Sequence, residues 1–192
     1  MTDLNKVQAL TAEELLKNFE VSDEAEEHLV PDTAPEVSIN RLIDAGLFPD
    51  AIKLLAHGLP KREAVWWACL AARDIQSPQT DEDNVNALIA AETWAKKPSE
   101  EARQRCKLFG TKTKHQTPAS WAATAASWCH GSLAAEGEPA VEPPEHLYAH
   151  AVAGSITLAA VLSDPVDPNK RFMRYMEQGL DLARGGNGRA EG

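Results

Sequence analysis

Cysteine is scarce in this sequence, and the spacing of the few cysteines fits no shared site. Cys69, Cys106 and Cys129 are odd in number, lie far apart, and each falls within a helical pattern. This arrangement excludes a disulfide framework and the close cysteine pairs typical of zinc sites. We therefore expect three buried free thiols.

Long hydrophobic runs and signal-like segments are also missing. The N-terminal stretch has no uninterrupted apolar run behind a basic segment, which argues against a secretory signal. The longest apolar run, residues 147–162, contains His150 and is shorter than the roughly 18 residues expected of a membrane-spanning helix. We expect a cytoplasmic protein that does not insert into a membrane.

Aromatic and β-branched residues are too few for a sheet protein. Aromatic residues make up 6% of the chain, and its apolar residues are weighted toward alanine and leucine. No strand-like alternation interrupts the helical periodicity. The sequence predicts an all-α fold, a compact helical bundle or a short stack of antiparallel helix pairs, with about seven to nine helices.

Positive charge is sparse and unevenly placed. The formal net charge is −10, and residues 1–36 hold ten acidic residues against only Lys6 and Lys17. Without a basic face of any size, the chain lacks the charge that supplies most nucleic-acid affinity, so we expect no nucleic-acid partner. The main basic cluster comprises Lys96, Lys97, Arg103, Arg105, Lys107, Lys112 and Lys114. It is either a solvated face or a docking site for the acidic segment 11–29, which alternatively docks on a similar patch of a partner.

Capping residues mark the starts of the helices. Thr11 begins a pattern that resembles a capping box, and Ser22, Ser99 and Thr117 are typical N-cap residues. Glycine is typical just past a helix end, so Gly110 is predicted to end the helix that Ser99 begins.

These signals divide the chain into three parts. We predict an acidic N-terminal arm over residues 1–34, partly helical or flexible, and a single all-α domain over residues 35–184. Residues 185–192 are expected to form a flexible glycine-rich tail. Within the domain, the helix expected from Pro144 to Leu162 is apolar or small on nearly every face, so it should be a central core helix buried on all sides.

Two adjacent tryptophans, Trp66 and Trp67, lie in an alanine-rich helical stretch. Successive helical residues diverge by about 100°, so the two indoles should point in different directions and form no joint aromatic platform. We expect Trp66 to stack under the guanidinium of Arg62 or Arg73, and both rings to finish the boundary of the core.

Candidate chemistry is confined to a few histidines. His146 and His150 share a helix face at the spacing used by two imidazoles on one metal, with His130 as a further possible ligand, but the glutamate of an HExxH motif is missing. Cys129 and His130 are helical neighbours and cannot pair side chain to side chain. We therefore expect no catalytic residues, no metal and no cofactor. A metal-dependent or acid-base enzyme using His146 and His150 is the alternative.

A family resemblance is carried by five stretches: LPKREAVWWACLAAR, ALIAAETWAKKPSEEARQRC, TPASWAATAASWCHGSLA, AHAVAGSITLAAVL and RFMRYMEQGLDLARGGNGR. Together they resemble an uncharacterised bacterial domain-of-unknown-function family over about residues 35–190. The resemblance implies an association with type VI secretion gene neighbourhoods, where small cytoplasmic proteins act as adaptors or chaperones for effectors. It implies no catalytic residues and does not include the acidic arm.

These observations predict a non-enzymatic cytoplasmic module that binds another protein, as an accessory adaptor or chaperone of a bacterial type VI secretion system. The expected partner is a secretion-system component or an effector. A structural subunit that self-associates is the other alternative, since the sequence does not specify the oligomeric state. The candidate contacts are glutamates of the acidic arm, namely Glu13, Glu14, Glu24, Glu26 and Glu27.

Overall fold

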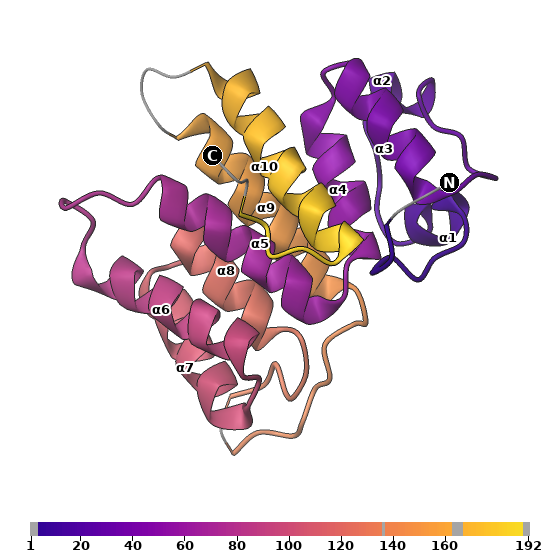
Figure 1. Cartoon of the computed structure of the whole chain (residues 1–192). Helices are drawn as coiled ribbons and strands as arrows, with labels where there is room; N and C mark the ends of the chain where they lie inside the picture. The colour runs from indigo at the N-terminus through magenta and orange to yellow at the C-terminus, as the bar shows by residue number, and fades with distance from the viewer. Residues whose placement is uncertain (1–3, 136, 163–166, 190–192) are drawn as a thin grey trace. The chain divides into compact units, whose positions relative to one another are not determined.

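The computed structural model describes residues 4–135, 137–162 and 167–189 of the 192-residue chain. All the regular secondary structure in these ranges is helical, which confirms the predicted all-α fold (Figure 1). The described residues form ten helices rather than seven to nine, and two of these, α1 and α2, span only five and four residues. The helices are α1 (Ala12–Leu16), α2 (Asp23–Glu26), α3 (Pro35–Asp44), α4 (Phe48–Gly58), α5 (Lys61–Asp74), α6 (Glu82–Lys96), α7 (Glu100–Lys112), α8 (Pro118–Ser127), α9 (Leu147–Val161) and α10 (Pro168–Arg184).

The described residues divide into two compact units. The first unit holds the described parts of 1–60 and 160–192, and the second unit holds Lys61–Ala159. Residues of the predicted arm belong to the first unit, since α1 contacts both α3 and α4. The domain boundaries predicted after residues 34 and 184 stay predictions.

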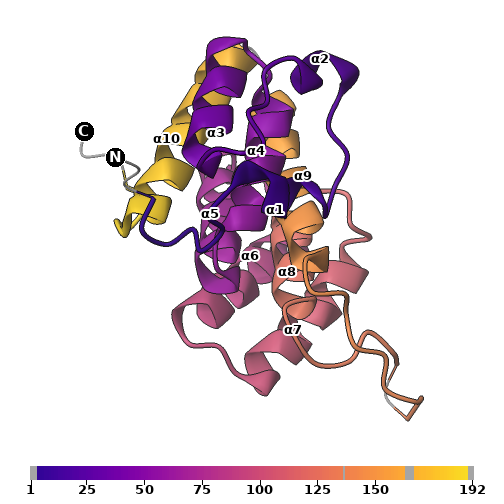
Figure 2. The ribbon, with the colours of Figure 1, turned by 90° about the vertical axis from the view of Figure 1, so that its right-hand side faces the viewer.

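The body of the first unit is formed by α3, α4 and α10, and α4 contacts the other two (Figure 2). Phe48 and Phe172 stack almost parallel with their ring centroids 5.4 Å apart, which joins α4 to α10. The Lys6 N–H donates to the Ala183 carbonyl at 2.8 Å. The N-terminal segment is therefore held against the end of α10.

In the second unit, α8 contacts α5, α6 and α7. Its sequence PASWAATAAS consists mostly of small residues, and nearly all of them are buried. Small residues let neighbouring helices approach closely. The Ser155 hydroxyl of α9 donates to the Pro118 carbonyl at 2.8 Å, which ties α9 to the start of α8.

The helix predicted from Pro144 to Leu162 is α9, and the prediction that it is buried on all sides is wrong. His150, Gly154 and Val161 are exposed. Their spacing of four and seven residues places them along one side of the helix. A side marked by one histidine, a glycine and a valine carries no run of charge, so the sequence pattern did not show it.

The predicted N-caps are largely confirmed. The side-chain oxygens of Ser22, Ser99 and Thr117 each accept a hydrogen bond from the backbone N–H three residues on. Thr11 occupies the N-cap of α1 without a side-chain capping bond, and its hydroxyl lies 3.5 Å from a Glu14 carboxylate oxygen. The signals for helix starts therefore hold even for a helix as short as α2.

Gly110 does not end its helix as predicted, because α7 continues through it to Lys112. Gly110 is buried, and a Cβ at this position would lie 2.8 Å from Thr124 Oγ1 on α8. The Ser120 hydroxyl of α8 also donates to the Gly110 carbonyl at 3.2 Å. The glycine thus permits α7 and α8 to pack closely.

The two adjacent tryptophans have different surroundings, as predicted. Trp67 is fully buried, whereas Trp66 is half-buried. The Lys96 ammonium lies over Trp66, 5.8 Å from the ring centroid. The expected stacking of Trp66 under a guanidinium stays a prediction. The guanidinium of Arg62 donates to the Ala95 carbonyl at 3.0 Å, and that of Arg73 pairs with a glutamate of α6.

Part of the basic cluster is engaged within the second unit. The Arg103 side chain is only 2% exposed, and its guanidinium binds both carboxylate oxygens of Glu100 at 2.6 and 2.7 Å. The same guanidinium donates to the carbonyls of Ser127 and Ser132. The Lys107 ammonium donates to the same Ser132 carbonyl and to two further ones, those of Leu133 and Ala134. We name this arrangement the carbonyl latch: Arg103 and Lys107 of α7 hold the backbone of residues 127–134.

Gly131 completes the carbonyl latch. Its φ of +74° lies in the left-handed region, which favours glycine. A Cβ at Gly131 would also lie 2.6 Å from the Arg103 guanidinium. The turn at Gly131 therefore needs a residue without a side chain, because the Arg103 guanidinium packs directly against it.

Two glycine substitutions should have opposite effects on stability. We expect Gly154→Ala to raise the free energy of unfolding by about 0.5–1 kcal/mol, since alanine favours the helix and a Cβ there meets no atom within 4 Å. Gly110→Ala should lower it, because the new Cβ would collide with Thr124. Urea unfolding of both variants checks this, and equal effects would contradict the account of Gly110.

The carbonyl latch should make stability depend on acid pH. Hydrogen bonding to Arg103 lowers the pKa of Glu100 from 4.5 to about 2. The Glu100 contribution is therefore fully present above pH 4.5 and is lost as the pH falls toward 2. Glu100 is 61% exposed, so solvent screening limits the loss to about 1 kcal/mol. As the pH falls through this range, the melting temperature of Glu100→Gln should fall less than that of Glu101→Gln, the neighbouring control.

Candidate functional site

The histidines proposed as metal ligands do not form a ligand set. His130 is exposed after α8, and its ring lies almost perpendicular to that of Trp94, with the ring centroids 5.8 Å apart. His150 is exposed on α9, and His146 is half-buried just before that helix begins. No group of three or more histidine, cysteine, aspartate or glutamate side chains is placed to hold a metal in the described ranges. The metal alternative therefore has no completed site here.

The three cysteines are free and buried, as predicted. Burial raises the pKa of the Cys106 thiol to about 12 and raises the pKa values of Cys69 and Cys129 as well. The Cys129 thiol donates to the Ala125 carbonyl, while the neighbouring His130 is exposed against Trp94. Cysteine nucleophiles act as thiolates, so these thiols are poorly suited to catalysis.

A depression of 450 Å³ lies beside His130 in the second unit. Lys61 and Glu142 also line it. The Lys61 ammonium donates to the Cys129 carbonyl at 2.8 Å and lies 5.7 Å from the centroid of the Tyr148 ring. Its cation thus serves the local packing, and the depression offers no convergent set of reactive groups.

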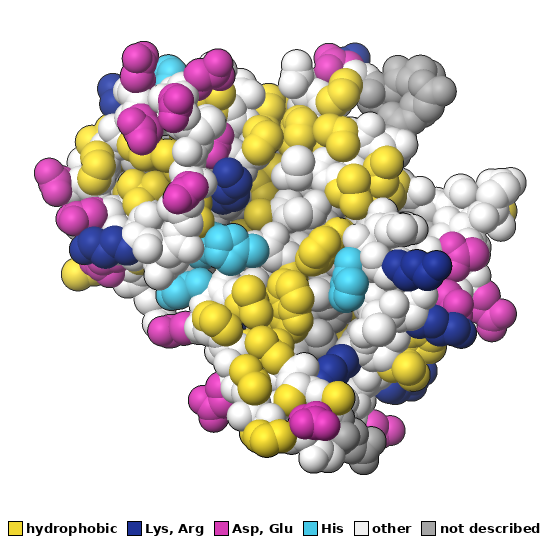
Figure 3. Space-filling view, turned by 180° about the vertical axis from the view of Figure 1, so that it is seen from behind, with side chains coloured by type: hydrophobic (Ala, Val, Ile, Leu, Met, Phe, Trp, Pro, Cys, Tyr) yellow, Lys and Arg dark blue, Asp and Glu magenta, His cyan; other side chains and the backbone are white. Residues whose placement is uncertain are grey.

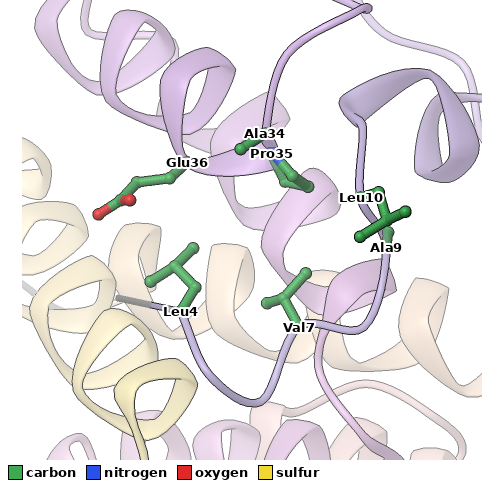
Figure 4. Close-up of a pocket in the computed structure, with 7 residues that line it drawn as sticks. All are labelled: Leu4, Val7, Ala9, Leu10, Ala34, Pro35 and Glu36. Carbon is green, nitrogen blue, oxygen red and sulfur yellow. The ribbon is translucent and has the colours of Figure 1, made fainter. Parts of the chain in front are cut away.

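The N-terminal segment forms a second, smaller depression against α3 (Figure 4). Its volume is 140 Å³, below the roughly 300 Å³ at which ligand pockets begin. Leu4 and Val7 point toward the start of α3, and Leu10 is 80% exposed. This depression is therefore small for a ligand site.

The largest of these depressions lies over α1 and α2 in the first unit, with a volume of 610 Å³. Its lining combines apolar side chains with carboxylates and includes no basic residue. Figure 3 shows acidic side chains gathered around hydrophobic ones over this part of the chain, at the upper left. We name this depression the acidic groove, and it is lined by Leu16, Phe19, Glu20, Val21, Asp23, Glu26, Leu29 and Pro31.

Backbone hydrogen bonds close the segment that forms the acidic groove. The Ala12 N–H donates to the Thr33 carbonyl at 2.8 Å, and the Glu13 N–H donates to the Pro31 carbonyl at 3.0 Å. These two bonds bring the ends of residues 12–33 together, so the segment between them forms a closed loop.

Asp50 of α4 holds the middle of this segment. Asp50 is 5% exposed, and its carboxylate accepts hydrogen bonds from the Ser22 N–H at 3.1 Å and the Ser22 hydroxyl at 2.9 Å. The Lys53 ammonium lies 3.3 Å from the same carboxylate and donates to the Glu20 carbonyl at 3.2 Å. The N-cap of α2 is thus fastened directly to α4.

Phe19 forms part of the lining and stacks on His57 of α4, with the ring centroids 4.4 Å apart. The His57 Nδ1 lies 2.8 Å from the Lys53 carbonyl. A carbonyl only accepts, so Nδ1 carries the hydrogen and the orientation of the imidazole is set. Phe19 therefore packs on an imidazole whose orientation is set by a hydrogen bond within α4.

All of the glutamates predicted as contacts are exposed. Of these, Glu26 lines the acidic groove. Glu24 and Glu27 are its neighbours around α2, while Glu13 pairs with Lys17 at 3.3 Å. The prediction of these residues as partner contacts stays a prediction.

Sequence reasoning missed the apolar half of the groove. Leu16 and Phe19 are three residues apart, a spacing typical of one helix face, but they straddle the end of α1. Leu29 joins them only because the chain turns back after α2. Hydrophobic residues recurring among the acids of 11–31 were the signal that was available.

Asp50→Ala should loosen the acidic groove. We expect the free energy of unfolding to fall by about 2–4 kcal/mol, because the Ser22 donors and Lys53 lose a buried charged acceptor. Hydrogen exchange at the Ser22 amide should quicken. Asp44→Ala, an exposed control on α3, should change stability by less than about 0.5 kcal/mol. An unchanged exchange rate at Ser22 would contradict the assigned role of Asp50.

No helix in the described part of the chain is long and apolar enough to cross a membrane. Comparisons with curated proteins and with solved structures found no match. The model of DUF6931, a family of unknown function, matches residues 38–183. This match gives no link to bacteria or to type VI secretion. The match begins after α2, so the acidic groove lies outside it. Because the match covers most of the chain, the protein belongs to the DUF6931 family.

Proposed function

We propose that this protein is a non-enzymatic cytoplasmic module that binds another protein through its acidic groove. The observation that carries the proposal is the groove itself, whose lining combines half-buried apolar side chains with exposed carboxylates. Apolar surface ringed by polar groups is typical of protein contact sites. The residues that line the groove lie before the family match, in the N-terminal segment.

The placement of the reactive side chains supports a binding role over a catalytic one. The buried cysteines have raised pKa values, and His130 and His150 are exposed in different settings. The finer proposal is that the protein is an accessory adaptor or chaperone of a bacterial type VI secretion system, with a component or an effector as its partner. This part rests on the family resemblance of the sequence alone.

Affinity purification after chemical cross-linking in the native cell tests the proposal. The test variant carries lysine at Glu13, Glu14, Glu24, Glu26 and Glu27. The control variant carries the same change of charge at exposed acids elsewhere, namely Asp44, Glu101, Glu138, Glu145 and Glu177.

We expect wild type and the control to retain one protein reproducibly, and the test variant to lose it, because reversal of the charge at and around the groove repels a complementary partner. Equal recovery by both variants, or no partner for wild type, would sink the proposal. Light scattering separates the remaining case. A homo-oligomer that dissociates in the test variant would favour a self-associating subunit.

A further inference from the structure

We propose that the acidic groove accepts a short cationic segment of a partner protein, which places an apolar side chain on the groove floor between flanking lysines or arginines. This inference rests on the proposed function and specifies the chemistry of the partner. It follows from the lining, the local charge, the size of the groove and the rigidity of its walls.

The lining sets two requirements on the occupant. Leu16, Phe19 and Leu29 offer apolar surface that water solvates poorly, so an apolar side chain gains by covering it. Glu20 and Asp23, with Glu26, put carboxylates of one sign around that surface. The matching segment is therefore apolar at its centre and positive on either side.

The nearby cations do not cancel this negative charge. The Lys53 ammonium is committed to Asp50 and to the Glu20 carbonyl, and Lys17 pairs with Glu13. None of the three acidic lining residues forms an ion pair within the described ranges. An acidic peptide, a nucleic acid or an anionic membrane surface would be repelled, which leaves a cationic protein segment.

The size of the groove points to a segment rather than a folded surface. A volume of 610 Å³ lies within the range of about 300–1,000 Å³ that holds a small ligand. It admits one or two anchoring side chains, as in peptide recognition by grooves. Contact energy concentrated in such anchors is typical of protein interfaces.

The walls of the groove are formed before any partner arrives. Phe19 is held by His57, Ser22 by Asp50, and the ends of the segment by the backbone bonds of Ala12 and Glu13. A preorganised site loses less conformational entropy on binding. A short segment can therefore bind without folding the groove around itself.

Fluorescence anisotropy with labelled peptides tests this inference on the full chain. The probe is a peptide of about 12 residues with leucine every three or four positions and lysine elsewhere. One control peptide replaces each lysine by glutamate, and another replaces each leucine by serine. Raising NaCl from about 0.1 M to about 1 M shortens the Debye length from about 10 Å to about 3 Å.

We expect the lysine–leucine peptide to bind at least about tenfold more tightly than either control peptide, and to weaken at high salt. Glu26→Lys should weaken binding about tenfold, whereas Glu24→Lys, on the same helix but outside the lining, should weaken it about twofold or less. Phe19→Ala and Leu29→Ala should each weaken binding, and Leu10→Ala should not. Thermal melting of each variant confirms folding, and Leu29→Ala serves if Phe19→Ala is unfolded.

Equal binding of the leucine and serine peptides would overturn the apolar anchor. Equal effects of Glu26→Lys and Glu24→Lys would overturn the groove as the contact, and so would no binding of any peptide. Failure of the proposed function looks different. If a captured partner is lost by the five-site reversal but kept by Phe19→Ala and Glu26→Lys, the module binds a protein and only the inferred groove chemistry fails.

Discussion

The buried carboxylate of Asp50 gives the acidic segment a defined shape. Helices as short as α1 and α2 are unstable alone, and a segment this rich in carboxylates repels itself. Asp50 offsets this instability, because it binds the N-cap of α2 through two donors of Ser22, and its partner Lys53 donates to the Glu20 carbonyl. The groove keeps its shape because the Asp50 carboxylate on α4 binds donors of Ser22 and Lys53.

The two units use charge for different ends. In the second unit, Arg103 and Lys107 turn inward and satisfy carbonyls that the chain leaves open after α8. In the first unit, the lining carboxylates stay at the surface and face solvent around an apolar floor. The formal charge of −10 is therefore distributed unevenly. Some positive side chains bind backbone carbonyls inside the second unit, while the negative side chains that line the groove are exposed.

The fold was predictable because local signals decide it. Ser22, Ser99 and Thr117 mark helix starts that can be read from the sequence, since their capping bonds reach only three residues along the chain. Gly110 misled because its role depends on Thr124 of another helix, and the exposed side of α9 was hidden by the lack of charge on it. The groove could not be predicted for the same reason as Gly110. Phe19 and Leu29 acquire a shared site only through the positions of His57 and Asp50 on α4.

The carbonyl latch also bears on which positions of the second unit can change. Every peptide unit presents the same oxygen, so the acceptors at Ser132, Leu133 and Ala134 do not depend on which side chains stand there. The donors are different, since a buried guanidinium that binds Glu100 and two carbonyls at once has no equivalent among the other side chains. The shape of this loop therefore depends on the donors of α7, on Gly131 and on the Ser132 hydroxyl, which accepts hydrogen bonds from the Ala134 and Val141 N–H groups. The side chains of Leu133 and Ala134 can change without loss of their carbonyl acceptors.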